Sequence, residues 1–64
     1  MNAQQINETG YAIPFYDSKK QVRIWRYAGK QYVLPADAVV MEKISGVPFM
    51  VARIEEVESA LRRQ

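Results

Sequence analysis

The residues best suited to do chemistry lie between positions 18 and 35, in the stretch SKKQVRIWRYAGKQYVLP. It contains five basic side chains, three aromatic side chains and no acidic one. Lysine and arginine neutralise phosphates and release counterions, while exposed aromatic rings stack on unpaired bases. The stretch therefore predicts a surface that binds nucleic acid. Its candidate binding residues are Lys19, Lys20, Arg23, Trp25, Arg26, Lys30 and Tyr32.

The aromatic residues of this stretch have a second interpretation. In a small domain a single tryptophan such as Trp25 usually belongs to the core, because its burial contributes a few kcal/mol of stability. Trp25, Tyr27 and Tyr32 would then form the buried face of a hairpin, and we favour this interpretation for them. The basic side chains cannot be core, so the cationic surface is expected under either interpretation.

Charge is unevenly distributed along the chain. The formal net charge is only +2, but residues 18–35 carry five basic groups, whereas residues 36–64 carry four basic and five acidic groups. A cationic surface also steers association with an acidic protein. We therefore predict a small non-enzymatic accessory or regulatory module that binds nucleic acid. The alternative is a protein-binding module, such as an inhibitor or assembly factor of the kind that phages and plasmids encode.

The composition argues against most catalytic and metal chemistry. The chain has no cysteine and no histidine, which removes disulfides, most zinc sites and the common nucleophile–base pairs. Asp17, Asp37 and Glu42 are spaced without any pattern that demands shared proton chemistry. We expect no enzyme activity, no catalytic residue, no metal site and no cofactor.

The length of 64 residues predicts a single small domain. Such a domain buries only about 60% of the surface that its unfolded chain exposes, so its stability is marginal. Without disulfides or a metal, a homodimer is the expected source of additional stability. No apolar run reaches the length of a membrane span, and we expect no signal peptide. We expect a cytoplasmic protein without a membrane partner.

The clearest structural element is a β-hairpin over residues 21–34. β-Branched and aromatic residues flank Ala28-Gly29-Lys30, and Gly29 suits the positive φ of a tight turn. With a two-residue loop, alternate side chains fall on opposite faces. One face then carries Arg23, Trp25, Tyr27, Tyr32 and Leu34, and the other carries Val22, Ile24, Arg26, Gln31 and Val33.

The residues before this hairpin predict a tail and one strand. Residues 1–9 are polar with no apolar period, which indicates a flexible N-terminal tail ahead of a single domain over residues 10–64. Tyr11 to Tyr16 form an apolar segment that Pro14 interrupts, which favours an edge strand or an extended arm. Asp17-Ser18 provides the turn that follows.

The residues after the hairpin are less regular. Residues 36–46 fit a short helix or a strand, with the β-branched residues slightly favouring the strand. VPFMVA, residues 47–52, predicts another extended run. The apolar residues between Val39 and Val51 form either the second face of the sheet, buried by the helix, or a surplus that one helix leaves uncovered and that suits self-association or a partner.

The C-terminal segment predicts an amphipathic helix that starts between Phe49 and Arg53. Ile54, Val57 and Leu61 fall at helical spacing on one stripe, with glutamates early and arginines late. Residues 46–56, GVPFMVARIEE, also resemble part of a helix-turn-helix motif. The motif's spacing is one residue short here, so we favour a strand that runs into the helix. The predicted fold is α+β: an antiparallel sheet of three to five short strands around the 21–34 hairpin, with one C-terminal amphipathic helix.

Overall fold

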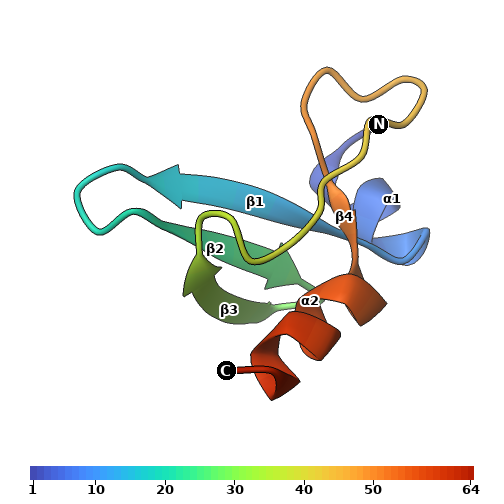
Figure 1. Ribbon diagram of the computed structural model, residues 1–64. Helices are drawn as coiled ribbons and strands as arrows, with labels where there is room; N and C mark the ends of the chain where they lie inside the picture. Colours follow the sequence, from blue (N-terminus) through green and yellow to red (C-terminus); the bar gives the residue numbers. More distant parts are fainter.

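The computed structural model describes residues 1–64 and contains a four-stranded antiparallel sheet and two helices (Figure 1). The elements in chain order are α1 (Ala3–Glu8), β1 (Tyr11–Asp17), β2 (Val22–Tyr27), β3 (Lys30–Pro35), β4 (Ala52–Arg53) and α2 (Ile54–Arg62). The predicted α+β class, with a C-terminal helix on an antiparallel sheet, is confirmed.

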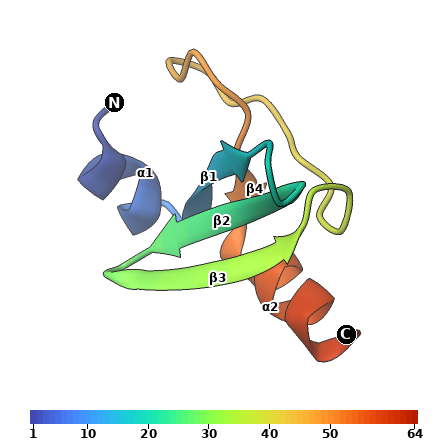
Figure 2. The same cartoon turned by 90° about the vertical axis from the view of Figure 1, so that its left-hand side faces the viewer.

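The sheet has the strand order β3-β2-β1-β4 (Figure 2). Strand β4 pairs only with Tyr11 and Ala12, so β1 has no second neighbour from Ile13 onward. Pro14 lies in this unpaired part, opposite Trp25. Proline has no N–H to give to a ladder, so this edge position suits it. Because β3 pairs with β2 over Val22–Tyr27, this part of the sheet has three strands, and only the β1–β2 turn of residues 18–21 projects beyond it, at the left of Figure 1.

The β2–β3 hairpin has the predicted turn and the predicted faces. Ala28 and Gly29 form a two-residue loop with φ angles of 49° and 80°. Positive φ at both positions is the geometry of a type I′ turn, which matches the twist of the flanking strands. Trp25 pairs with Tyr32 and Arg23 with Leu34, so these side chains share one face of the sheet. The predicted face assignment is therefore confirmed.

The larger hydrophobic core lies between this face and helix α2. Its buried residues come from all four strands, α2 and the loop after β3: Ala12, Trp25, Leu34, Val39, Ala52, Val57 and Ala60. Trp25 is the largest of them and is 0% exposed, while Tyr27 and Tyr32 are partly buried against the cluster. The indole Nε1 of Trp25 has no hydrogen-bond partner. Trp25 therefore acts as a hydrophobic core residue.

A second, smaller core corrects the prediction of a flexible N-terminal tail. Residues 3–8 form helix α1, and its Ile6 is buried against Val47 and Val51. The helix begins with a capping box: the Asn2 side chain accepts from the backbone N–H of Gln5, and the Gln5 side chain accepts from that of Asn2. Such caps satisfy backbone donors that a short helix otherwise leaves free. The N-terminus is therefore part of the folded unit.

Residues 36–50 form neither a helix nor a ladder strand, which corrects both predictions for residues 36–46. The one regular contact of this segment is an isolated bridge, in which the backbones of Glu42 and Val51 exchange two hydrogen bonds of 2.7 and 2.9 Å. The rest of the segment is held in place by two buried side chains, those of Val39 and Val47. The predicted surplus of apolar residues is therefore limited to the side chains that stay exposed, which include Val40, Phe49 and Met50.

Helix α2 begins at Ile54, one residue after the predicted range, with Arg53 as its N-cap. It follows strand β4 directly, so the strand-into-helix interpretation is correct and the helix-turn-helix one is wrong. Val57 and Ala60 are buried, and Glu55, Glu56 and Arg62 lie at the ends that the helix dipole favours. Neither α1 nor α2 is long and apolar enough to cross a membrane.

Candidate nucleic-acid interface

The structure divides the seven predicted site residues between the core and three separate parts of the surface. Trp25 is fully buried, which corrects its assignment as a stacking residue. Tyr32 is partly buried against the same core and offers less ring surface than an exposed platform would. The stacking role that the sequence suggested for these two rings is therefore not supported by their positions.

The five predicted cations do not form one continuous patch. Lys19 and Lys20 lie in the β1–β2 turn, and Arg23 follows close by on the same face as Trp25. Arg26 lies on the opposite face of the sheet, because it is an odd number of residues from Arg23 along β2. Lys30 follows the β2–β3 turn, at the other end of the strands. Only Lys19, Lys20 and Arg23 are therefore gathered at one end.

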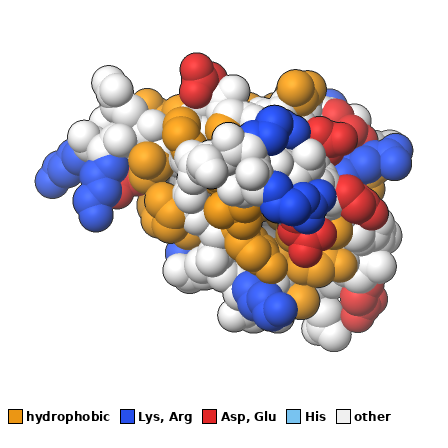
Figure 3. Space-filling view, turned by 60° about the horizontal axis from the view of Figure 1, so that its bottom comes forward, with side chains coloured by type: hydrophobic (Ala, Val, Ile, Leu, Met, Phe, Trp, Pro, Cys, Tyr) orange, Lys and Arg blue, Asp and Glu red, His pale blue; other side chains and the backbone are white.

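The β1–β2 turn holds its two lysines on a defined backbone. The Asp17 carboxylate accepts hydrogen bonds from the backbone N–H groups of Lys19 (3.0 Å) and Lys20 (3.3 Å). This is the local side-chain-to-backbone bonding that aspartate favours in turns. Both lysines are exposed. At the left end of Figure 3, which corresponds to this turn, basic side chains project into solvent.

Two exposed aromatic residues beside the turn were not among the predicted site residues. Phe15 is 56% exposed and Tyr16 is 50% exposed. The guanidinium of Arg26 lies 5.6 Å from the ring centroid of Phe15, and that of Arg23 lies 5.5 Å from the centroid of Tyr16. These are cation–π distances. The sequence could have predicted that one of these rings faces away from the core. Adjacent residues of a strand point to opposite faces, so Phe15 and Tyr16 cannot both face the core.

None of the five hairpin cations is neutralised by a carboxylate. The single ion pair in the structure joins Arg53 to Glu42 at 3.9 Å, and both side chains are well exposed. Glu42 also accepts a hydrogen bond from the hydroxyl of Tyr11. No group of three or more carboxylates is close enough together to hold a metal ion. The positive charge of the β1–β2 turn therefore faces solvent, with Asp17 as the nearest acidic residue along the chain.

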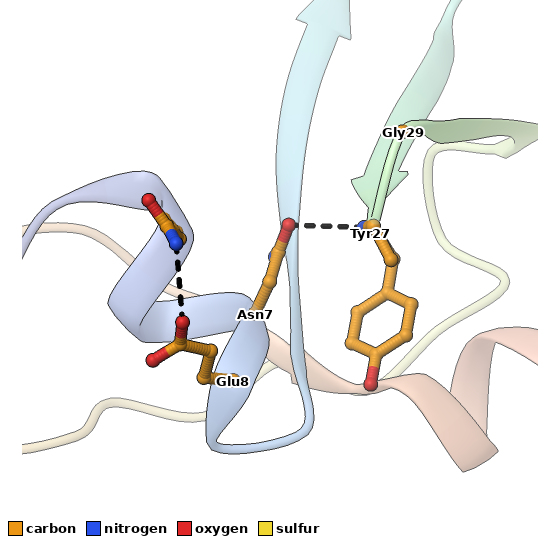
Figure 4. A pocket seen from close by; sticks show the side chains of 6 residues that line it. Asn7, Glu8, Tyr27 and Gly29 are labelled. Atoms are coloured by element: carbon orange, nitrogen blue, oxygen red, sulfur yellow. Dashed lines mark hydrogen bonds between the residues drawn. The ribbon is translucent and has the colours of Figure 1, made fainter.

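The largest cavity, about 480 Å³, lies between α1 and the β2–β3 turn. Its lining residues are Gln4, Asn7, Glu8, Tyr27, Ala28 and Gly29. Asn7 joins the two elements: its Oδ1 accepts from the backbone N–H of Ala28 at 3.1 Å (Figure 4), and its Nδ2 donates to the carbonyl of Tyr11. Gln4 donates to Glu8 at 3.2 Å. Because the Asn7 side chain uses both its oxygen and its nitrogen to tie α1 to the β2–β3 turn and to β1, we interpret the cavity as part of a structural joint.

Comparison with protein families, with curated proteins and with solved structures found no significant match. The functional argument therefore depends on the geometry of the hairpin alone.

Proposed function

We propose that this protein is a small non-enzymatic accessory module that binds nucleic acid through the β1–β2 hairpin. The observation that carries the proposal is the group formed at the projecting turn by the exposed Lys19 and Lys20 and the partly buried Arg23, where no carboxylate forms an ion pair with them. Arg26 and Lys30 lie elsewhere and are assigned no phosphate contact at this turn. The contacts are therefore a subset of those expected from the sequence.

The physical basis is counterion release. Each phosphate that a lysine or arginine neutralises frees condensed counterions, so the affinity falls as salt concentration rises. Three contacts predict a decline of about 2 to 3 logarithmic units in affinity per logarithmic unit of salt. Binding that rests on so few contacts is expected to be weak and insensitive to sequence, with Kd values of about 10⁻⁴ to 10⁻⁶ M at physiological salt.

A fluorescence anisotropy titration of a labelled oligonucleotide, repeated over a range of salt concentrations, tests the proposal. The double variant Lys19→Gln/Lys20→Gln is expected to lose about two-thirds of the salt slope. Lys43→Gln/Arg62→Gln is the matched control, because it removes the same charge from exposed positions outside the hairpin. An equal loss in both variants, or no salt-dependent binding by the unmodified protein at low salt, would contradict the proposal.

An acidic protein surface is the second candidate ligand for the same hairpin. The half-exposed Tyr16 beside Arg23 favours it, because tyrosine and arginine are enriched among the residues that dominate protein interfaces. The expected homodimer and the expected cytoplasmic location also stay predictions. Sedimentation equilibrium tests the first, and a tightly folded monomer over the micromolar range would refute it.

A further inference from the structure

The face of the sheet opposite the large core is unusually apolar. We define the open face by the nine side chains that point away from Trp25 where β1, β2 and β3 pair side by side. The strand register sets them in three cross-strand rows: Ile13–Arg26–Gln31, Phe15–Ile24–Val33 and Asp17–Val22–Pro35. An antiparallel sheet with one solvated face normally carries polar residues there. Six of these nine side chains are hydrophobic, including the whole middle row.

Only one end of the open face is covered by the protein itself. Helix α1 and the segment around Val47 pack against Ile13, at the start of β1. Phe15 and Val33 in the middle row are 56% and 55% exposed, and Ile24 between them is only partly buried. In Figure 2, β2 and β3 lie in front of β4 and α2, and α1 lies toward one end of these strands. The middle row is therefore left to solvent.

The size of the open face argues against a second copy of this chain as its occupant. Three strands about 4.8 Å apart and three rows about 6.8 Å apart give an area of about 300 Å². A stable dimer buries about 800 Å² on each partner. The open face is therefore too small to hold a dimer by itself, and it matches the footprint of a short segment.

The charge of the open face defines the complementary ligand. Arg26 is the only cation on it, lies over the ring of Phe15, and has no carboxylate partner. Asp17, its only acid, is bonded to the backbone of the β1–β2 turn. A ligand that covers the middle row therefore surrounds a guanidinium that needs a counter-charge. Leaving that charge unpaired in a desolvated interface would be costly.

We propose that the open face binds a short segment of another protein whose apolar side chains cover Phe15, Ile24 and Val33 and whose carboxylate pairs with Arg26. This site is separate from the proposed nucleic-acid contacts, because Lys19 and Lys20 occupy the turn and Arg23 points to the other face. The two activities can therefore be lost independently. A module with both would connect nucleic acid to an acidic, apolar segment of a partner protein.

Titration of the ¹⁵N-labelled protein with a short peptide of leucine and glutamate tests this site by NMR. The expected result is amide shifts confined to the open face, with binding about tenfold tighter than that of the matched leucine–lysine peptide. Val33→Glu is expected to abolish these shifts and Arg26→Gln to weaken binding severalfold. Val40→Glu is the matched control, because Val40 is an exposed valine outside the sheet and its variant should bind normally.

Any of five outcomes would overturn the proposal, and the first four come from the peptide titration. They are equal binding of the basic peptide, absence of binding at millimolar peptide, equal effects of Val33→Glu and Val40→Glu, and displacement of the peptide by oligothymidine, which would assign the face to nucleic acid. Self-association that Val33→Glu abolishes would likewise assign the face to a second copy. Apart from the displacement by oligothymidine, these results do not depend on whether Lys19 and Lys20 bind an oligonucleotide, so the two proposals fail separately.

Discussion

The two hairpins of this protein share strand β2 but differ in how far their side chains are buried. The β2–β3 hairpin closes through two residues and places Trp25 and Leu34 fully inside the core. The β1–β2 hairpin closes through residues 18–21 and extends beyond the end of β4, and its Phe15 and Tyr16 are half exposed. No element of the fold buries these two rings, so they are available for binding. One hairpin stabilises the fold and the other carries the candidate site.

The largest expected effect contrasts the aromatic side chains of the two hairpins. Trp25→Ala leaves a large cavity in the core and is expected to cost about 3–5 kcal/mol, enough to unfold most of the protein. Phe15→Ala removes a half-exposed ring and is expected to cost less than about 1 kcal/mol. Urea denaturation followed by circular dichroism measures both. Similar costs for the two variants would mean that the hairpins do not differ as described.

The next effect concerns helix α1, which supports the ends of both hairpins. Ile6→Ala removes the buried side chain that anchors this helix against Val47 and Val51, and is expected to cost about 2–4 kcal/mol. Gln4→Ala is the control, because Gln4 is exposed on the same helix. Thermal unfolding of the two variants compares them. An unchanged Tm for Ile6→Ala would restore the interpretation of residues 1–9 as a flexible tail.

The smallest expected effect sharpens the description of the β2–β3 turn. Ala28 adopts a left-handed backbone with φ of 49°, which costs energy for an alanine but is tolerated by asparagine. Ala28→Asn creates the Asn-Gly pair that type I′ turns prefer, and should stabilise the protein by about 0.5–1 kcal/mol. A higher urea midpoint with an unchanged m-value is the expected result. A lower midpoint would contradict the assigned turn.

The β2–β3 hairpin and helix α2 could be predicted from the sequence because their signals are local. Gly29 marks the turn, period-2 alternation around Trp25 sets the faces, and the spacing of Ile54, Val57 and Leu61 defines the helical stripe. In these elements, propensity, pattern and burial agree. Such agreement across levels is what makes a segment predictable.

Helix α1 and the loop after β3 could not be predicted in the same way. Helix α1 has six residues with Ile6 as its only buried one, so no apolar period exists. The Asn2…Gln5 spacing of its capping box is typical of a helix start, but the interpretation of residues 1–9 as a tail did not take it into account. The loop is fixed by contacts of Val39 and Val47 with distant elements, and such tertiary contacts leave no periodic pattern.

The candidate site was predictable in its charge and not in its aromatic residues. Lys19, Lys20 and Arg23 can be read from the sequence as a cluster of like charge. The exposure of Phe15 and Tyr16 depends on which distant elements pack over this end of the sheet, which no local pattern encodes. A stacking role was predicted for Trp25 from its residue type, but in the structure its side chain fills the core.

NMR mapping of oligonucleotide binding at low salt tests the central claim most directly, because Trp25 provides an internal reference. The claim is that the β1–β2 hairpin binds through its turn while the shared core stays closed. The account predicts shifts for the backbone amides of residues 17–23 and no shift for the buried indole N–H of Trp25. Shifts of that indole and of the amides near Lys30, with the β1–β2 turn unchanged, would contradict it.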